Sequence, residues 1–203
     1  YTRVNVLSPL QNVVKSTNLF FQALQDNPAI AICLIGSVVL RMHSNVTQSL
    51  QQLWVKEYIQ DNVDSGLIYA NLSAAGNIVN IFCVFFMGKL VDKFPSKVVI
   101  PLVFLINGCS FFLITLITDP SSYVSYCIWI ILTLCFPLET IAIENYFSRN
   151  VPKEIRGLMY GVYFFCGLFG RLICYKSAAI LFRIDHNWPF MMIGICHFAY
   201  LLF

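Results

Sequence analysis

"FFMGKLVDKFPSKVVIPLVFLI", residues 85–106, joins two apolar runs through a short insert that carries mostly positive charge. The charged side chains of the insert are Lys89, Asp92, Lys93 and Lys97. The core of a soluble protein would not tolerate them, because burying an unpaired ammonium costs on the order of several kcal/mol or more. A loop between two membrane spans would tolerate these charged side chains, because water reaches the loop on one side of the bilayer. The stretch therefore predicts two transmembrane helices joined by a short turn.

The composition of the whole chain agrees with this interpretation. Its 203 residues are 58% hydrophobic and 11% charged, whereas a soluble domain carries about 25% charged residues. Apolar stretches recur at residues 28–54, 66–88, 98–118, 123–147, 157–182 and 189–203. All but the last, which we take as truncated, are long enough to cross a hydrocarbon core of ~30 Å at ~1.5 Å per residue. We therefore expect an all-α polytopic membrane protein of six transmembrane helices, present here as a fragment.

Basic residues are concentrated in alternate loops of this arrangement. Residues 1–27 and the loops around 88–97 and 149–156 hold most of the lysines and arginines, and the opposite loops are richer in acidic residues. The positive-inside rule places the basic side in the cytoplasm. The net charge of +3 therefore requires no nucleic-acid partner. Residues 1–27 are expected to form a cytoplasmic linker segment, and residues 28–203 a transmembrane domain in the lipid bilayer.

The sequence offers no motif for catalysis or for a cofactor. All eight cysteines lie within the apolar runs, and none forms a CxxC pair. They are interpreted as small thiols rather than as disulfides or a metal site. No HExxH motif and no paired aspartates within the spans support an intramembrane enzyme. We therefore expect neither enzymatic activity nor a bound cofactor or metal.

The first apolar stretch has a polar face. At about 100° per residue, one side of a helix collects the polar residues Ser37, Arg41, Ser44, Asn45, Gln48 and Gln52. The opposite side collects Val39, Met42, Val46, Leu50 and Leu53, and His43 lies nearly opposite Arg41. Alternatively, the span ends near Leu40, but about 12 apolar residues would cover only ~18 Å. We favour a continuous helix with one face in water or in a polar protein interior.

Three other stretches carry polar residues that must be sheltered from lipid. Asn77 shares a helix face with Ser73 and Asn80, where interhelical hydrogen bonds and solute contact are equally compatible. Glu139 lies deep in its span, and Tyr163 and Arg171 share one face of the next. Glycines beside that face, at positions 157, 161, 167 and 170, would allow close helix packing.

These residues make up the candidate solute site: Arg41, Asn45, Gln48, Asn77, Glu139, Tyr163 and Arg171. Two guanidiniums against one carboxylate favour an anionic solute, organic or phosphorylated. Two alternatives stay open: Arg171 pairs structurally with Glu139, or Glu139 carries a coupling proton.

The insert of residues 88–97 resembles a known signature, the major facilitator superfamily loop G-x-L-x-D-x-x-G-R-[KR]. Gly88, Leu90, Asp92 and Lys97 match, whereas Pro95 replaces the second glycine and Ser96 the arginine. "NVPKEIRGLMYG", residues 150–161, is similar to the P-x-x-x-R-G junction that enters the fifth helix of a half in that family.

The resemblance implies the second six-helix half of a transporter whose N-terminal half is missing. It implies a secondary active transporter that moves a small solute by alternating access, with a proton or another coupling ion. The first, second, fourth and fifth helices would border the central cavity. Gly88, Asp92, Lys93 and Lys97 would form a gating loop that contacts neighbouring helix ends. The alternative is a receptor or scaffold of the same fold that does not transport.

Overall fold

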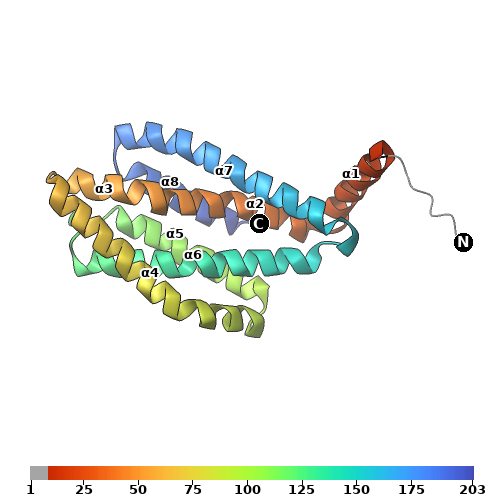
Figure 1. Ribbon diagram of the computed structural model, residues 1–203, viewed down its shortest axis with the longest axis horizontal. Coiled ribbons are helices and arrows are strands. Elements are labelled where there is room, and N and C mark those ends of the chain that lie inside the picture. Colours follow the sequence, from red (N-terminus) through yellow and green to blue (C-terminus); the bar gives the residue numbers. More distant parts are fainter. Residues whose placement is uncertain (1–8) are drawn as a thin grey trace, which may run out of the picture.

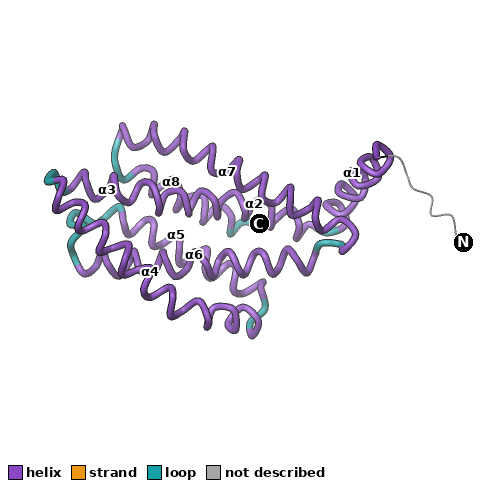
Figure 2. Tube along the Cα trace, viewed as in Figure 1, coloured by secondary structure: helices purple, strands orange, loops and turns teal. Residues whose placement is uncertain are grey.

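The described part of the chain consists of helices joined by short connections. The computed structural model describes the backbone of residues 9–203 and the side chains of residues 17–203, apart from those at positions 45 and 48. Within this range every regular element is a helix (Figure 2). The elements labelled in Figure 1, with the two short helices η1 and η2, are α1 (Pro9–Asp26), α2 (Pro28–Asn45), η1 (Val46–Leu50), α3 (Gln51–Tyr58), α4 (Asn62–Lys93), α5 (Ser96–Ile114), α6 (Tyr123–Asn150), η2 (Lys153–Ile155), α7 (Arg156–Ile184) and α8 (Trp188–Tyr200).

Several of these helices can cross a membrane. In the described range four are long and apolar enough: α4, α5, α6 and the run Lys153–Ile184, which joins η2 to α7. A fifth span is counted if Thr17–Asp26 and Pro28–Ser44, which meet at 101°, are taken together. The chain is thus an all-α, multi-pass integral membrane protein. The count of six spans stays a prediction, because α2 is counted only together with the bent segment before it and because α8 has 13 residues.

The predicted start of the first span is confirmed at Asn27. Its side-chain oxygen accepts a hydrogen bond from the amide of Ala29 at 3.2 Å, and Pro28 is the first helical residue. The side-chain nitrogen of Asn27 donates to Oδ1 of Asn150 at 3.0 Å, which ties the start of α2 to the end of α6. Before this corner lies helix α1, which the mixed, polar composition of residues 1–27 did not predict.

The helices form two layers (Figure 1). Helix α2 packs against α7 and α6, and α6 packs against α4, so that α7, α2, α6 and α4 form one layer. Helices α5 and α8 pack against each other and lie behind α6 and α2. This order agrees with the resemblance, which places the third and sixth helices of a half away from the central cavity.

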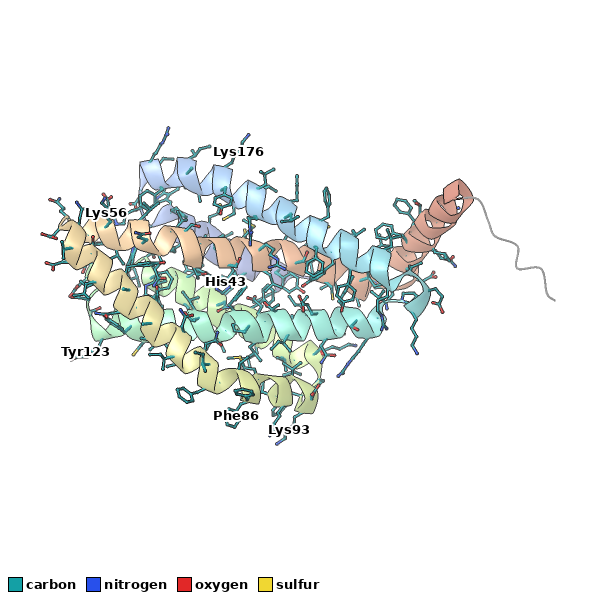
Figure 3. The ribbon with its side chains drawn as sticks, viewed as in Figure 1. His43, Lys56, Phe86, Lys93, Tyr123 and Lys176 are labelled. Carbon is teal, nitrogen blue, oxygen red and sulfur yellow. The ribbon has the colours of Figure 1, made fainter. Side chains whose placement is uncertain are left out.

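The outer surface is apolar, as expected for helices surrounded by lipid. Phe82, Phe85 and Phe86 of α4 are each about two-thirds to three-quarters exposed. Figure 3 shows Phe86 on the outer side of α4, with Lys93 beyond it near the end of the helix. Large contiguous apolar patches of this kind are rare on soluble monomers. They fit a bilayer environment.

The first span continues past Leu40 through a π-helical turn. Helix α2, the five residues of η1 and helix α3 follow without a break to Tyr58, and Trp54 and Val55 are fully buried. A π turn holds about one extra residue, which rotates everything after it by roughly 100°. For this reason Leu53, expected on the apolar side, is 47% exposed, and Gln51 rather than Gln52 is buried.

Candidate functional site

A polar pocket opens between η1 and α3 of the first span, α4 and α6. Its volume is about 370 Å³. Oxygen- and nitrogen-bearing side chains dominate its wall, which is formed by Thr47, Gln51, Tyr69, Ser73, Asn77, Asn80, Leu132, Thr133 and Phe136. None of these side chains carries a formal charge at neutral pH. The pocket therefore presents hydrogen-bonding groups, within the membrane-spanning part of the molecule, to a neutral polar part of a ligand.

Helix α4 supplies the polar wall as its sequence predicts. Ser73, Asn77 and Asn80 follow the helical repeat and share the face that meets α6. Gly76 brings the two helices close, because a Cβ at this position would lie 2.7 Å from Oγ1 of Thr133. Oδ1 of Asn80 is buried and has no hydrogen-bond partner among the described residues. Such an orphan acceptor calls for an explanation in a native site, and a donor group of a ligand is one.

The π turn supplies the opposite wall. Oγ1 of Thr47 donates to the carbonyl oxygens of His43 and Ser44 at 3.2 and 3.1 Å, so this hydroxyl stabilises backbone groups that the irregular turn frees. The turn also rotates Gln51 into the pocket. Single π turns within α-helices are often found at functional sites. Gln51 was not predicted to line a polar face, because the prediction assumed an uninterrupted α-helix with 3.6 residues per turn.

The two arginines lie along the contact between α2 and α7. A Cβ at Gly167 would lie 2.7 Å from Cγ of Arg41, so the arginine stem runs directly over this glycine. The guanidinium lies 5.8 Å from the ring centre of Phe164, a cation–π distance. Arg171 follows Gly167 by one helical turn; it is half-buried, and its Nε has no hydrogen-bond partner among the described residues.

An acid near Arg41 is Glu144, which was not among the predicted site residues. The half-buried Glu144 carboxylate is close enough to Arg41 for the two charges to attract. The carboxylate on this side of the bundle is therefore Glu144 rather than the Glu139 that the sequence analysis expected.

Glu139 is the main correction to the predicted site. Its carboxylate is fully buried, with Oε2 3.3 Å from Nδ1 of His43 and Oε1 3.4 Å from Nε2 of His197. Oε2 also accepts a hydrogen bond from the amide of Asn107 at 3.0 Å. The expected pair with Arg171 does not form in the described part of the chain. Glu139 instead points from α6 toward α2, α5 and α8, away from α7 and outside the polar pocket.

The other predicted residues divide between the pocket and the protein core. Asn77 lines the pocket. Tyr163 is 2% exposed and packs on Phe147, with ring centres 4.9 Å apart, so it belongs to the core rather than to the pocket. The side chains of Asn45 and Gln48 lie outside the described residues. The pocket residues that sequence reasoning missed, Tyr69 and Thr133 among them, are single polar positions in apolar runs and gave no periodic signal.

The charged loop contacts a neighbouring helix end. Oδ1 of Asp92 lies 3.8 Å from a guanidinium nitrogen of Arg149, the basic residue in the last turn of α6. Both side chains are more than half exposed. The ammonium nitrogen of Lys93, the residue after Asp92, lies 5.8 Å from the ring centre of Phe94. A Cβ at Gly88 would meet nothing within 4 Å. The loop thus joins the α4–α5 turn to α6 through charge.

Long helices with an apolar outer surface and a polar pocket between them define a polytopic membrane protein. The comparison with protein families agrees. Residues 4–174 match the family described as the Major Facilitator Superfamily. The chain belongs to this superfamily, and its family indicates a transporter. No curated protein and no solved structure matches the chain.

Proposed function

We propose that this chain forms part of a secondary active transporter that moves a small solute by alternating access, with the polar pocket as part of its binding site. The observation that carries the proposal is the pocket itself. It is walled by uncharged polar side chains of three membrane elements, and its volume lies in the range of about 300–1,000 Å³ that is usual for small-molecule sites. Sites of this kind lie between helices in transporters.

The amides of the pocket would bind polar groups of the solute. Asn77 and Asn80 on α4 and Gln51 on α3 each offer a donor and an acceptor. Asn80 has an acceptor atom that no described side chain or backbone group satisfies. A hydroxyl or amide of the solute supplies that missing partner.

The arginines favour an anionic solute, organic or phosphorylated. Arg41 and Arg171 carry two positive charges along the α2–α7 contact, and Glu144 offsets one of them. The remaining positive charge is costly in a low-dielectric environment unless an anion balances it. Guanidinium groups bind carboxylates and phosphates in bidentate geometry. We therefore propose a carboxylate or phosphate ester that also carries neutral polar groups.

The test is counterflow into proteoliposomes that contain the full-length protein. The probes are a radiolabelled dicarboxylate, a sugar phosphate, a neutral sugar and a quaternary amine. We expect counterflow of at least one anion and none of the quaternary amine. Transport of only the neutral or cationic probes would overturn the anion class. Tight binding without counterflow of any probe would indicate a receptor instead.

Asn77→Ala tests the pocket directly. Loss of one or two hydrogen bonds to the solute costs about 1–3 kcal/mol, so we expect the apparent KM to rise on the order of tenfold. Asn71→Ala is the matched control, because Asn71 lies on the same helix and is exposed like Asn77 but does not line the pocket. Equal kinetics for the two variants would remove the pocket from the binding site.

A further inference from the structure

Three helices bring two histidines and a glutamate together inside the bundle. His43 comes from α2, Glu139 from α6 and His197 from α8, and all three side chains are completely buried. Figure 3 shows His43 between the helices, in the interior of the molecule. One nitrogen or oxygen atom from each residue lies within 4.8 Å of the others. These are metal-ligating side chains, and the proposed transport does not use them.

The protonation of His197 is fixed by its backbone partner. Nδ1 of His197 lies 2.9 Å from the carbonyl oxygen of Ile193, and a carbonyl can only accept a hydrogen bond. Nδ1 therefore carries the ring proton. In the neutral imidazole, Nε2 then directs a lone pair at Oε1 of Glu139, 3.4 Å away. Two electron-rich atoms that face each other in a dry interior require a positive charge between them or on one of them.

The cluster lacks the hydrogen bonds that a purely structural polar network would have. Four buried atoms have no hydrogen-bond partner among the described residues: His43 Nε2, Asn107 Oδ1, Glu139 Oε1 and His197 Nε2. Buried polar side chains in native proteins are nearly always paired. Two of these atoms, Glu139 Oε1 and His197 Nε2, face each other and are candidate ligand atoms. His43 faces Glu139 through Nδ1, so its Nε2 is outside that contact. Asn107, whose Oδ1 is unpaired, donates to Glu139 from α5.

The distances between the ligand atoms suit one bound metal ion. Ligand atoms at about 2.0–2.1 Å from a tetrahedral ion are roughly 3.3–3.4 Å apart. Oε2 of Glu139 lies 3.3 Å from Nδ1 of His43, and Oε1 lies 3.4 Å from Nε2 of His197, so each carboxylate oxygen faces one imidazole. Histidine ligands usually donate their second ring N–H to a carbonyl or carboxylate, and carboxylate ligands are in turn hydrogen-bonded. The bond from His197 to Ile193 and the bond from Asn107 to Glu139 have these forms.

We propose that His43, Glu139 and His197 bind a divalent transition-metal ion of the Zn²⁺ class, which holds α2, α6 and α8 together. Two imidazoles and a carboxylate suit Zn²⁺ and its first-row neighbours rather than Mg²⁺ or Ca²⁺. The rings of Phe104, Phe111 and Phe136 contact the histidines and surround the site with apolar atoms. Phe136 also lines the polar pocket, so it separates the metal site from the solute site. The sequence carries no metal motif because the ligands come from three distant helices.

The test uses the full-length protein purified in detergent, stripped with a chelator and titrated with Zn²⁺, Co²⁺ or Mg²⁺. We expect Zn²⁺ to bind with one high-affinity ion per chain and to raise the midpoint of thermal unfolding, and Mg²⁺ to do neither. Bound Co²⁺ should show the intense visible absorption of a tetrahedral N/O site. The proposal is wrong if Zn²⁺ does not bind stoichiometrically, or if Zn²⁺ and Mg²⁺ have equal effects on the unfolding midpoint. This test needs no variant.

Variants assign the ligands. His43→Gln, His197→Gln and Glu139→Gln should each abolish the Co²⁺ spectrum, and Asn107→Ala should weaken Zn²⁺ binding about 10–100-fold as an outer partner. His186→Gln is the matched control, since His186 is the third histidine of the chain and bonds Tyr58 near the end of the bundle. If His186→Gln rather than His43→Gln removes the metal, the assignment is wrong. If Glu139→Gln stabilises metal-free protein and Zn²⁺ has no effect, the cluster holds a proton instead.

Discussion

Arg41 shows how one residue can be placed by a glycine on another helix. Its stem crosses α7 over Gly167, and its guanidinium reaches the ring of Phe164 and the field of Glu144. The position is therefore fixed by the shape of α7 rather than by an ion pair alone. A lysine can follow the same path with its stem, but it cannot offer the planar, bidentate head group.

We therefore expect Arg41→Lys to leave the amount of folded protein unchanged and to raise the apparent KM for an anionic solute. Losing one of two bonds to a charged group costs about 1.5–3 kcal/mol, or roughly 10- to 100-fold in KM. Initial uptake rates over a range of solute concentrations measure this effect. Arg183→Lys, an exposed arginine in the last turn of the same α7, serves as the control. An unchanged KM in Arg41→Lys would remove this guanidinium from the solute site.

The residue scale also shows where sequence reasoning stopped. The depth of Glu139 in its span follows from the rise per residue and was predicted. Its direction around α6 depends on which helices pack there, and the sequence of α6 alone does not contain that information. The histidines offered a signal: two of the chain's three lie inside apolar runs, and a buried carboxylate needs such partners. His43 was set aside because it lies opposite Arg41, yet that is the side that Glu139 faces.

At the scale of elements, the contact between α2 and α7 depends on Gly170. A Cβ at this position would lie 2.5 Å from the backbone oxygen of Val38, and backbone cannot move aside as a side-chain tip can. Of the four glycines expected to allow close packing, Gly167 and Gly170 do so. Around Gly157 and Gly161 a Cβ would meet nothing within 4 Å, so these two are not packing glycines within the described chain.

Gly170→Ala should therefore force α2 and α7 apart. Overpacking of this kind costs about 1–3 kcal/mol, and we expect a lower midpoint of thermal unfolding in detergent. Gly161→Ala is the control on the same helix, where alanine meets no neighbour and gains up to about 1 kcal/mol in helix propensity. Comparing the unfolding midpoints of the two variants separates the cost of helix overpacking from the gain in helix propensity. Equal midpoints would mean that α2 and α7 are less closely packed than described.

The π turn explains why the first span was predicted correctly as a helix, whereas the buried and exposed sides of its second half were not. The amphipathic stripe correctly placed Val39, Met42 and Val46 in the core, all before or at the start of the turn. Beyond it the assumption of 3.6 residues per turn fails: Leu53, expected on the apolar side, is exposed, and Gln51, which had no place in the predicted polar stripe, is buried. Nothing in the composition of residues 46–50 marks a π turn.

At the scale of the molecule, the apolar runs predicted the four spans α4, α5, α6 and α7, and the loop signature predicted the family. The layers agree with the resemblance, because α5 and α8, which carry almost no polar stripe, lie together in the second layer. Helix α1 and its bend of 101° against the first span were not predicted. Residues 9–26 do repeat apolar side chains at helical spacing, but the prediction relied on the polar overall composition of residues 1–27 and overlooked that repeat. At the bend, Asn27 caps α2 and bonds Asn150 of α6, a contact between distant parts of the chain that the sequence does not show.

The loop charge pair acts on the molecule as a whole. Asp92 and Arg149 join the α4–α5 turn to the end of α6, so any movement of these helices relative to each other changes their distance. Because both side chains are largely exposed, the pair is worth at most about 1 kcal/mol. That amount shifts an equilibrium between inward- and outward-facing states by up to about fivefold. It is too small to unfold the protein and large enough to change a transport rate.

We therefore expect Asp92→Arg and Arg149→Asp each to alter the maximal uptake rate about two- to fivefold while protein levels stay normal. The double variant restores opposite charges at the same two positions and should recover much of the wild-type rate. Uptake at saturating solute, normalised to purified protein, measures both effects. Lys89→Glu provides the control, because Lys89 is exposed near the same end of α4 and forms no ion pair among the described residues. If the double variant is as slow as the sum of the single changes predicts, the loop acts through its overall charge rather than through this pair.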